Sequence, residues 1–366
     1  MKIAYVINSL ECGGAQLPIP DIISVLQSRG GEVTVFSLEK RDGLAIPVLE
    51  KQGIRVHVRS GGKKDHLAAW RWLRDEMDAF QPDLIWTSLT RATLLGQRAA
   101  NRLGVPAVHW QHSARLKKAN SILLRLLCRK AALWVADSPT VESFSRKCLG
   151  LRSKVMAWPI FRADPASPKA AAWKKGKIIR IGSLGRLHAV KGYDLLFEAL
   201  DLLRDHPDLP PYRVVLAGDG PERDSLEKVV QDKKLPVDFL GHCEDPFSFL
   251  PTLHLYVQPS HWEGMCVAAH EAMTCGLAVI ATPAGELPPT MKDGHSGLVV
   301  PCNNAPVLAS AIAELIMQPK KLHTRGTLSR KLVLDRFGPD AFLRQGNAVL
   351  DRLPGFSPAP DDASRS

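Results

Sequence analysis

The sequence lacks the features that mark a disulfide-stabilised, metal-binding or membrane-spanning protein. Its 366 residues include seven cysteines, and none of these forms a CxxC pair or a spacing typical of zinc ligands. No apolar run is long enough to cross a bilayer. The first run, residues 3–7, is too short for the core of a secretory signal. We therefore expect a cytoplasmic protein with reduced thiols and no metal site.

Acidic residues are missing from a long central segment. Between Asp83 and Asp137 there is no Asp or Glu, although the segment is rich in Lys and Arg and the whole chain has a net charge of +11. A surface of one sign attracts phosphates, whether on a membrane, a lipid diphosphate or a nucleic acid. A solvated basic face without a ligand is the plainer alternative. Because no zinc finger or RNP-type strand is present, nucleic acid is the least favoured partner.

Short apolar runs alternate with helical patterns along most of the chain, which predicts parallel sheets covered on both faces. The fold class is therefore α/β, with two Rossmann-like, doubly wound domains. We place the N-terminal domain at 1–160, a linker near 158–176, the C-terminal domain at 177–338 and a disordered tail at 354–366.

The expected elements follow from these patterns. Strands are expected at 3–7, 32–38, 55–58, 83–87, 107–111, 133–137, 178–183, 213–217, 237–240, 255–258, 278–282 and 297–300. Helices are expected at 19–27, 67–80, from about 88 to 103, and at 193–204, 223–233, 265–275, 306–317 and 339–353.

The strongest chemical signal follows the strand that ends at Gln258. A loop carries Glu263 and Gly264, and the expected helix then begins with free amides at 265–267, which suit a diphosphate. Glu263 and Glu271 would lie about 12 Å apart on a helix, as needed for one carboxylate on a sugar hydroxyl and one on a ribose. Alternatively, Glu263 is a favourable acid at a helix start and Glu271 is a surface residue.

A second segment, residues 182–192, joins a strand to a helix. It places Arg186 and Lys191 at the carboxyl edge of the sheet, where doubly wound folds bind ligands. Two cations there can neutralise a departing nucleoside diphosphate. The segment matches neither GxGxxG nor a Walker A loop, which argues against a dinucleotide oxidoreductase and a P-loop NTPase. A basic loop without a function is the alternative.

Five motifs in order resemble glycosyltransferase family 4, whose members are retaining enzymes of the GT-B fold. They are Gly13-Gly14-Ala15, the Gly-Ser-Leu-Gly-Arg-Leu…Lys-Gly stretch from Gly182, Gly218-Asp219-Gly220-Pro221, Phe239-Leu240-Gly241, and the two glutamates with seven residues between them. The resemblance covers nearly the whole chain and is tighter in the C-terminal half. It implies that the helix at 339–353 returns to the N-terminal domain, which binds the acceptor.

The resemblance also implies a role for each candidate site residue. It assigns Arg186 and Lys191 to the donor diphosphate, Glu263 to the transferred sugar, Glu271 to the ribose, the backbone of Gly264, Met265, Cys266 and Val267 to the phosphates, the backbone near His242 to the base, and Gly13 and Gly14 to the edge of the cleft. It further implies a UDP- or GDP-sugar as the donor substrate, and no metal or other cofactor.

One histidine is a candidate from the N-terminal domain. In enzymes of the family that this chain resembles, a histidine at the position of His112 faces the reacting sugar, whereas His109 lies within a strand and is expected to be packed. A packed, structural His112 is the alternative. The chain departs from the family pattern at Gln16, where glutamate is usual, and at 285–289, which lie near the donor sugar.

A basic amphipathic helix is expected within 114–134. Lys118, Arg125 and Arg129 would share one face, and leucines would line the rest. Such a helix could bind an anionic membrane and a polyprenyl diphosphate-linked acceptor, or it could pack its leucines inward as an ordinary helix.

The sequence thus predicts a retaining glycosyltransferase on the inner face of the cytoplasmic membrane, acting in bacterial surface-glycan or lipopolysaccharide assembly. Its acceptor would be a glycan or a lipid-linked glycan. A GT-B-shaped nucleotide-sugar epimerase and a non-catalytic scaffold are the alternatives.

Overall fold

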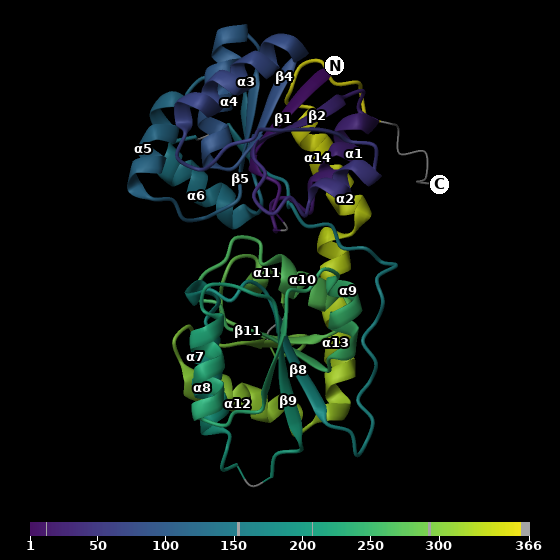
Figure 1. Cartoon of the computed structure of the whole chain (residues 1–366). Coiled ribbons are helices and arrows are strands. Elements are labelled where there is room, and N and C mark those ends of the chain that lie inside the picture. The colour runs from purple at the N-terminus through teal and green to yellow at the C-terminus, as the bar shows by residue number, and fades with distance from the viewer. Residues whose placement is uncertain (12, 152–153, 207, 292–293, 360–366) are drawn as a thin grey trace, which may run out of the picture. The chain divides into compact units, whose positions relative to one another are not determined.

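The computed structural model describes residues 1–11, 13–151, 154–206, 208–291 and 294–359. The chain divides into two compact units: Met1–Arg162 with Asp340–Ser366, and Ala163–Pro339 (Figure 1). Within the described ranges, no helix has the length and apolar character needed to span a membrane.

The first unit is built on a seven-stranded parallel sheet in the order β3-β2-β1-β4-β5-β6-β7. Its strands are β1 (Lys2–Ser9), β2 (Glu32–Glu39), β3 (Arg55–Val58), β4 (Leu84–Ser88), β5 (Ala107–Gln111), β6 (Leu133–Ala136) and β7 (Val155–Ala157). The chain runs outward from β1 in one direction and then from β4 in the other. The switch point of this doubly wound sheet therefore lies between β1 and β4.

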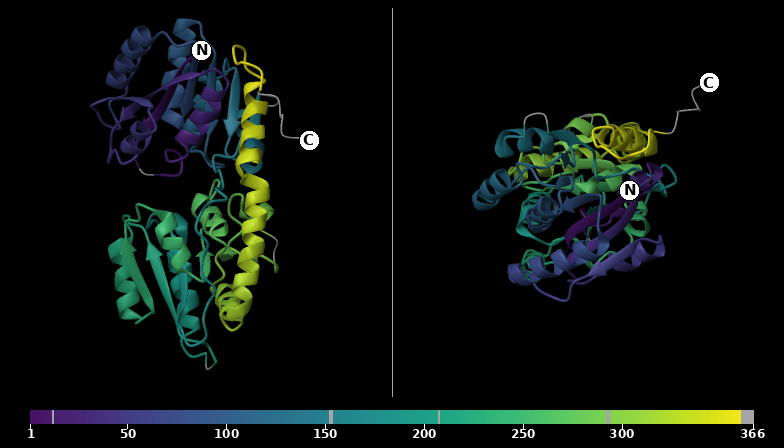
Figure 2. Two further views of the ribbon diagram at one scale, coloured as in Figure 1. Left: turned by 90° about the vertical axis from the view of Figure 1, so that its right-hand side faces the viewer. Right: turned by 90° about the horizontal axis from the view of Figure 1, so that it is seen from above.

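Helices pack around this sheet, and the last of them comes from the far end of the chain. They are α1 (Ile19–Ser28), α2 (Ile46–Lys51), α3 (His66–Phe80), α4 (Thr90–Leu103), α5 (Lys118–Leu127), α6 (Pro139–Leu149) and α14 (Pro339–Leu350). In α14, yellow in Figure 2, Phe342 packs on Trp158, with ring centroids 5.4 Å apart. The buried Arg29 donates hydrogen bonds to Asn347 and to Asp351.

The second unit repeats the strand order of the first with six parallel strands, β10-β9-β8-β11-β12-β13. They are β8 (Ile179–Leu184), β9 (Tyr212–Ala217), β10 (Val237–Gly241), β11 (Leu255–Gln258), β12 (Ala278–Ala281) and β13 (Gly297–Val299). The helices are α7 (Tyr193–Leu202), α8 (Arg223–Asp232), α9 (Pro246–Phe249), α10 (Val267–Thr274), α11 (Leu287–Thr290), α12 (Ala305–Ile316) and α13 (Pro319–Phe337), with two 3-10 turns, η1 (Ala189–Lys191) and η2 (Leu250–Thr252).

The predicted α/β fold with two doubly wound parallel sheets is confirmed, and each predicted strand is present within one or two residues of its expected bounds. The prediction missed β7, the helices α2, α6, α9 and α11, and the 19-residue helix α13. Of the predicted tail, residues 354–359 contain no helix or strand, and residues 360–366 lie outside the described part of the chain.

Candidate active site

The second unit brings two loops together at the carboxyl edge of its sheet. One loop follows β8 and contains Lys191 in the turn η1, and the other follows β11 and contains Glu263. They meet because β8 and β11 are adjacent strands on either side of the switch point. This edge is where doubly wound folds bind their ligands.

The carboxylate of Glu263 is held from one side. Its Oε1 accepts hydrogen bonds from Lys191 Nζ at 2.7 Å, from Ser260 Oγ at 2.7 Å and from Gln258 Nε2 at 3.4 Å. Behind them, the Tyr256 hydroxyl donates to Gln258 Oε1 at 2.8 Å. All three donors bind the same oxygen. No described residue donates a hydrogen bond to Oε2, which is therefore open to a ligand.

The ion pair with Glu263 also determines the charge state of Lys191. The side chains of Lys191 and Glu263 are 20% and 11% exposed. Burial is the largest single effect and lowers the pKa of the lysine, but the charge and hydrogen bond of Glu263, together with the nearby Cys266 and Tyr193, outweigh it, and the net effect is a raised pKa. Lys191 therefore remains a cation at neutral pH.

Arg186 lies in the loop after β8, as predicted, but it does not join this ion pair. Its side chain is exposed and makes no ion pair with any described residue. A guanidinium without a protein partner can bind a ligand anion without first breaking a salt bridge.

The prediction of a helix starting at Met265 is wrong. α10 begins at Val267, and its N-cap Cys266 has a left-handed backbone with φ of +63°. A left-handed residue cannot lie inside a right-handed helix. The first-turn amides without intrahelical acceptors therefore belong to Val267 and the two alanines after it, whereas Met265 and Cys266 are buried in the preceding loop.

The position of this loop depends on a close backbone approach. Gly285 has φ of +61°, and a Cβ built on it would lie 2.1 Å from the carbonyl oxygen of Gly264. Only glycine fits here. The unusual sequence at 285–289 keeps this glycine, while Glu286 is buried and paired with Arg336 at 2.5 Å.

Glu271 lies in the second turn of α10, and His242 is exposed directly after β10. Burial raises the pKa of the Glu271 carboxyl to about 7, and the negative charge of Asp245 adds to this effect. A carboxyl with this pKa exchanges its proton near neutral pH, so a donor of hydrogen bonds would favour its ionised form.

In the first unit, His112 lies in a Ser-His-Asp arrangement after β5. Its Nδ1 is 3.0 Å from Asp137 Oδ1, and its Nε2 is 2.5 Å from Ser88 Oγ. A carboxylate only accepts, so Nδ1 carries the proton and Nε2 accepts from Ser88. Ser88 is fully buried and inaccessible as a nucleophile. The arrangement fixes the tautomer and orientation of His112.

The other N-terminal candidates are placed as follows. Gly13 and Gly14 lie in the loop after β1, where the carbonyl of Gly13 accepts from the amide of Gln16 at 3.0 Å. Gln16 is buried, and its Nε2 donates to Ser9 O at 3.2 Å. His109 is packed, as predicted, and burial lowers its pKa to about 3.

The expected basic helix is shorter than predicted. α5 ends at Leu127, so Lys118 and Arg125 lie on it, whereas Arg129 lies beyond its end. The alternative in which its leucines pack inward holds only in part, because Leu124 of α5 is buried whereas Leu123, Leu126 and Leu127 are exposed. The exposed apolar side chains of α5 are Ile122, Leu123, Leu126 and Leu127.

Sequence reasoning identified Lys191 but missed Ser260 and Gln258, which also bind Glu263, and both partners of His112. Gln258 is a buried polar residue at the end of the apolar strand β11, and this was its only signal in the sequence. In the same way, Ser88 ends β4 and Asp137 follows β6, the two strands that flank β5. Among the described residues, no group of three or more His, Cys, Asp or Glu side chains is arranged to hold a metal ion.

Two doubly wound parallel sheets of this order form the GT-B fold. Residues 13–160 match the family model "Glycosyltransferase Family 4", and residues 166–331 match "Glycosyl transferases group 1". The chain therefore belongs to glycosyltransferase family 4, with both halves matched by glycosyltransferase models. It is an enzyme that transfers a sugar from a nucleotide-sugar donor.

Similar proteins include the D-inositol 3-phosphate glycosyltransferase of Saccharomonospora viridis, at 28% identity over 87% of this chain and 84% of that protein. A component of the phosphatidylinositol N-acetylglucosaminyltransferase of Arabidopsis thaliana is 33% identical over 62% of this chain and 53% of its own length. The crystal structure of HepE from Anabaena with UDP and glucose has a TM-score of 0.84 and 23% identity, covering 96% of this chain and 100% of that one.

Proposed function

We propose that the second unit binds the donor, a UDP- or GDP-sugar, through the residues around Glu263. The diphosphate is bound by Arg186 and Lys191 together with the backbone of Gly264, Met265, Cys266 and Val267. Glu263 holds the transferred sugar, and Glu271 holds the ribose. The backbone near His242 borders the base. The observation that carries this proposal is the contact of Lys191 with Glu263, 2.7 Å long, beside the first turn of α10.

We propose that transfer retains the anomeric configuration and needs no metal. Arg186, Lys191 and the amides at the start of α10 neutralise the departing diphosphate. The acceptor hydroxyl attacks from the face that the diphosphate leaves, and the diphosphate accepts its proton. His112, whose tautomer is fixed by Asp137, contacts the reacting sugar. Gly13 and Gly14 form the edge of the cleft.

The donor proposal is tested by thermal shift with UDP-, GDP- and ADP-sugars on wild type, Glu271→Ala and the control Glu198→Ala, which alters an exposed residue of α7. Selective stabilisation by one nucleotide series is expected in wild type and in the control, with its loss in Glu271→Ala. Equal stabilisation of all three proteins would refute the assigned role of Glu271.

We propose that the acceptor is a glycan or a lipid-linked glycan with a phosphate group, used at the inner face of an anionic membrane in surface-glycan assembly. Two observations support it. The two relatives described above are named for inositol phosphate or phosphatidylinositol. Exposed apolar side chains of α5 lie among Lys118, Arg125 and Arg129, beside a cavity of about 650 Å³. Apolar groups flanked by cations suit an anionic lipid surface.

The membrane proposal is tested by vesicle sedimentation with and without anionic lipid. The triple change of Lys118, Arg125 and Arg129 to Glu should abolish binding to anionic vesicles. A charge-matched control changes Lys228, Lys320 and Lys331 of the second unit to Glu and should bind like wild type. Equal binding by both triple variants would rule out α5 as the membrane contact.

A further inference from the structure

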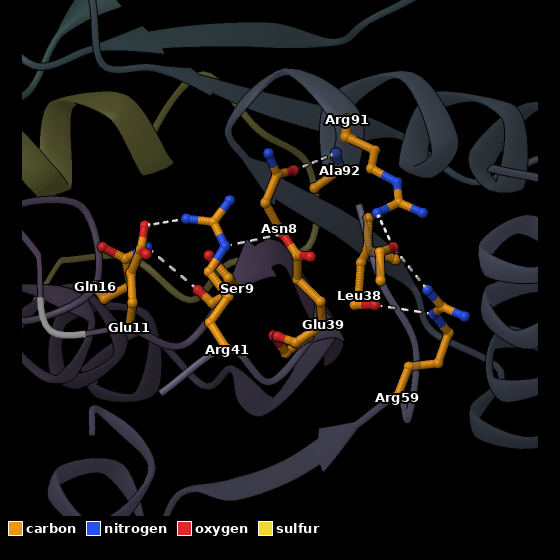
Figure 3. A network of polar contacts seen from close by, with 12 residues as sticks. Asn8, Ser9, Glu11, Gln16, Leu38, Glu39, Arg41, Arg59, Arg91 and Ala92 are labelled. Atoms are coloured by element: carbon orange, nitrogen blue, oxygen red, sulfur yellow. Dashed lines mark hydrogen bonds and ion pairs between the residues drawn. The ribbon is translucent and has the colours of Figure 1, made fainter. Parts of the chain in front are cut away.

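Charged side chains of the first unit gather over the carboxyl ends of β1 to β4 (Figure 3). Arg59 directly follows β3, and Arg91 is the second residue of α4, which follows β4. In the sheet order, β2 and β1 lie between these two strands. Arg59 donates to Leu38 of β2, and the amide of Ala92, next to Arg91, donates to Asn8 of β1. The two arginines therefore meet over the carboxyl ends of β2 and β1, beside the switch point between β1 and β4, where doubly wound folds bind ligands.

Arg59 is fixed by the strands beneath it. Its side chain is 6% exposed, and its Nε donates to the carbonyl of Leu38, at 2.9 Å. Figure 3 shows the guanidinium turned toward that of Arg91. Because Arg59 is anchored to the backbone of β2, its charge has a defined place at the sheet edge.

One carboxylate holds both arginines. Asp65 Oδ1 accepts from Arg59 Nη2 at 2.7 Å and from Arg91 Nη2 at 2.9 Å. Two cations and one anion leave a net positive charge. Arg91 Nε is also buried without an acceptor. The pair therefore has more charge and more donors than Asp65 satisfies.

Asp65 ends a short surface loop and is the N-cap of α3, whose first turn it holds through its backbone carbonyl and not its side chain. Its side chain can therefore turn away from the arginines without unfolding the sheet. Residues 60–64 are exposed and include two glycines and two lysines, and Asp65 itself is 37% exposed. The loop lies directly on Arg59, since a Cβ on Gly61 would be 2.1 Å from Arg59 Nη1. Among the described residues, the side chain of Asp65 and the carbonyl of Gly62 are what accept from the Nη donors of the two arginines.

We propose that Arg59 and Arg91 form a binding site for a phosphate group, and that Asp65 occupies this site until the phosphate displaces it. A phosphate offers more acceptor oxygens than a carboxylate and binds guanidinium groups in the same bidentate manner. This inference rests on the proposed phosphate-bearing acceptor, and it assigns that phosphate to a site in the first unit. Lys63 and Lys64 add positive charge at its entrance.

The test is calorimetric titration of the full chain with inorganic phosphate. It is performed in an Arg186→Ala/Lys191→Ala background to remove the cations of the donor site. Asp65→Asn should bind phosphate at least tenfold more tightly than its parent, because the internal competitor is gone. Arg91→Gln should bind at least tenfold more weakly. The matched controls Asp78→Asn and Arg102→Gln alter an exposed ion pair of the same unit and should leave the affinity unchanged.

A purely structural role for Asp65 predicts the opposite pattern. Asp65→Asn would then lower stability without tightening phosphate binding, and this result would overturn the inference. Hydrogen exchange gives a second readout, because the amide of Gly62 donates to Asp65 Oδ2 at 3.2 Å. Phosphate should speed exchange at Gly62 in the parent. No change there would also contradict displacement.

The source of the phosphate is separated with two probes, myo-inositol 1-phosphate in solution and phosphatidylinositol in phosphatidylcholine vesicles. Weaker binding of the soluble probe alone by Arg91→Gln assigns a soluble acceptor, and weaker binding of the vesicles assigns a lipid. No effect on either refutes the site. Because none of these readouts needs sugar transfer, the site can fail while donor binding, tested with Glu271→Ala, still holds.

Discussion

At the scale of single residues, the site depends on groups that fix one atom of a functional side chain. Ser260, Gln258 and Lys191 all bind Oε1 of Glu263, and Asp137 fixes the proton of His112. Each is buried or nearly so, and each keeps its partner in a single orientation. Orientation of this kind acts on the rate of the reaction more than on substrate binding.

Ser260→Ala removes one neutral donor from Glu263 and leaves the ion pair with Lys191. A net hydrogen bond is worth about 1 kcal/mol, so kcat should fall about fivefold to tenfold with little change in KM. The measurement is steady-state kinetics with the donor found by thermal shift. Ser225→Ala, on the surface of α8, is the control, and an unaltered kcat for Ser260→Ala would contradict the positioning role.

Glu271 gives the protein a pH dependence of known direction. Folding raises its pKa from 4.5 to about 7, so between these values the folded chain binds more protons than the unfolded one. The free energy of unfolding contributed by this group therefore falls as the pH rises through this window. Glu271→Gln removes this pH dependence. The free energy of unfolding of the variant relative to wild type should therefore be higher at about pH 8 than at about pH 5.

Urea unfolding at both pH values measures this difference, with Glu198→Gln as the control. A constant difference between Glu271→Gln and wild type would show that the carboxyl does not titrate in this range.

At the scale of elements, the sequence reveals what is apolar and periodic. Central strands such as β1 and β11 are continuous apolar runs and were predicted within a few residues. The helix α13 was missed because its buried face includes Gly326, Ser329 and Arg330 beside Leu322 and Val333. The buried groups at the site were missed for a related reason, since hydrogen-bond partners on other strands leave no periodic pattern.

Arg330 explains how α13 tolerates a charge on its buried face. Its Nη1 donates to the carbonyl of Thr274 at the end of α10, and its Nη2 donates to that of Pro165 at 2.5 Å. Arg330→Met keeps the length but leaves both carbonyls without this partner, which should lower the free energy of unfolding of the second unit by about 2–4 kcal/mol. The control Lys331→Met alters the exposed residue that follows Arg330 and should change this free energy little.

Calorimetric unfolding checks this prediction. A loss as small as that of Lys331→Met would mean that water replaces the guanidinium.

At the scale of the whole molecule, the chain forms two doubly wound sheets, the first with one strand more than the second, and the first unit needs the last helix. Arg29, in the first unit, is 2% exposed at its side chain and pairs with Asp351 at 2.7 Å. Arg29→Met should therefore lower the free energy of unfolding of the first unit by about 2–4 kcal/mol. The transition temperature of the second unit should not change.

Arg330→Met serves as the reciprocal control in the same calorimetric experiment, since it should affect only the second unit. If Arg29→Met lowered both transitions equally, the two units would unfold as one.

The return of α14 to the first unit also bears on biosynthesis. The strands of the first sheet leave the ribosome early, but Phe342, which packs on Trp158, is made only after some 180 further residues. At synthesis rates of 5–20 residues per second, this takes roughly 10–35 s. The second unit can fold in that interval, whereas the first must wait with Trp158 uncovered. If synthesis stalls before α14 is made, the first unit, although synthesised first, therefore lacks the helix that completes its fold.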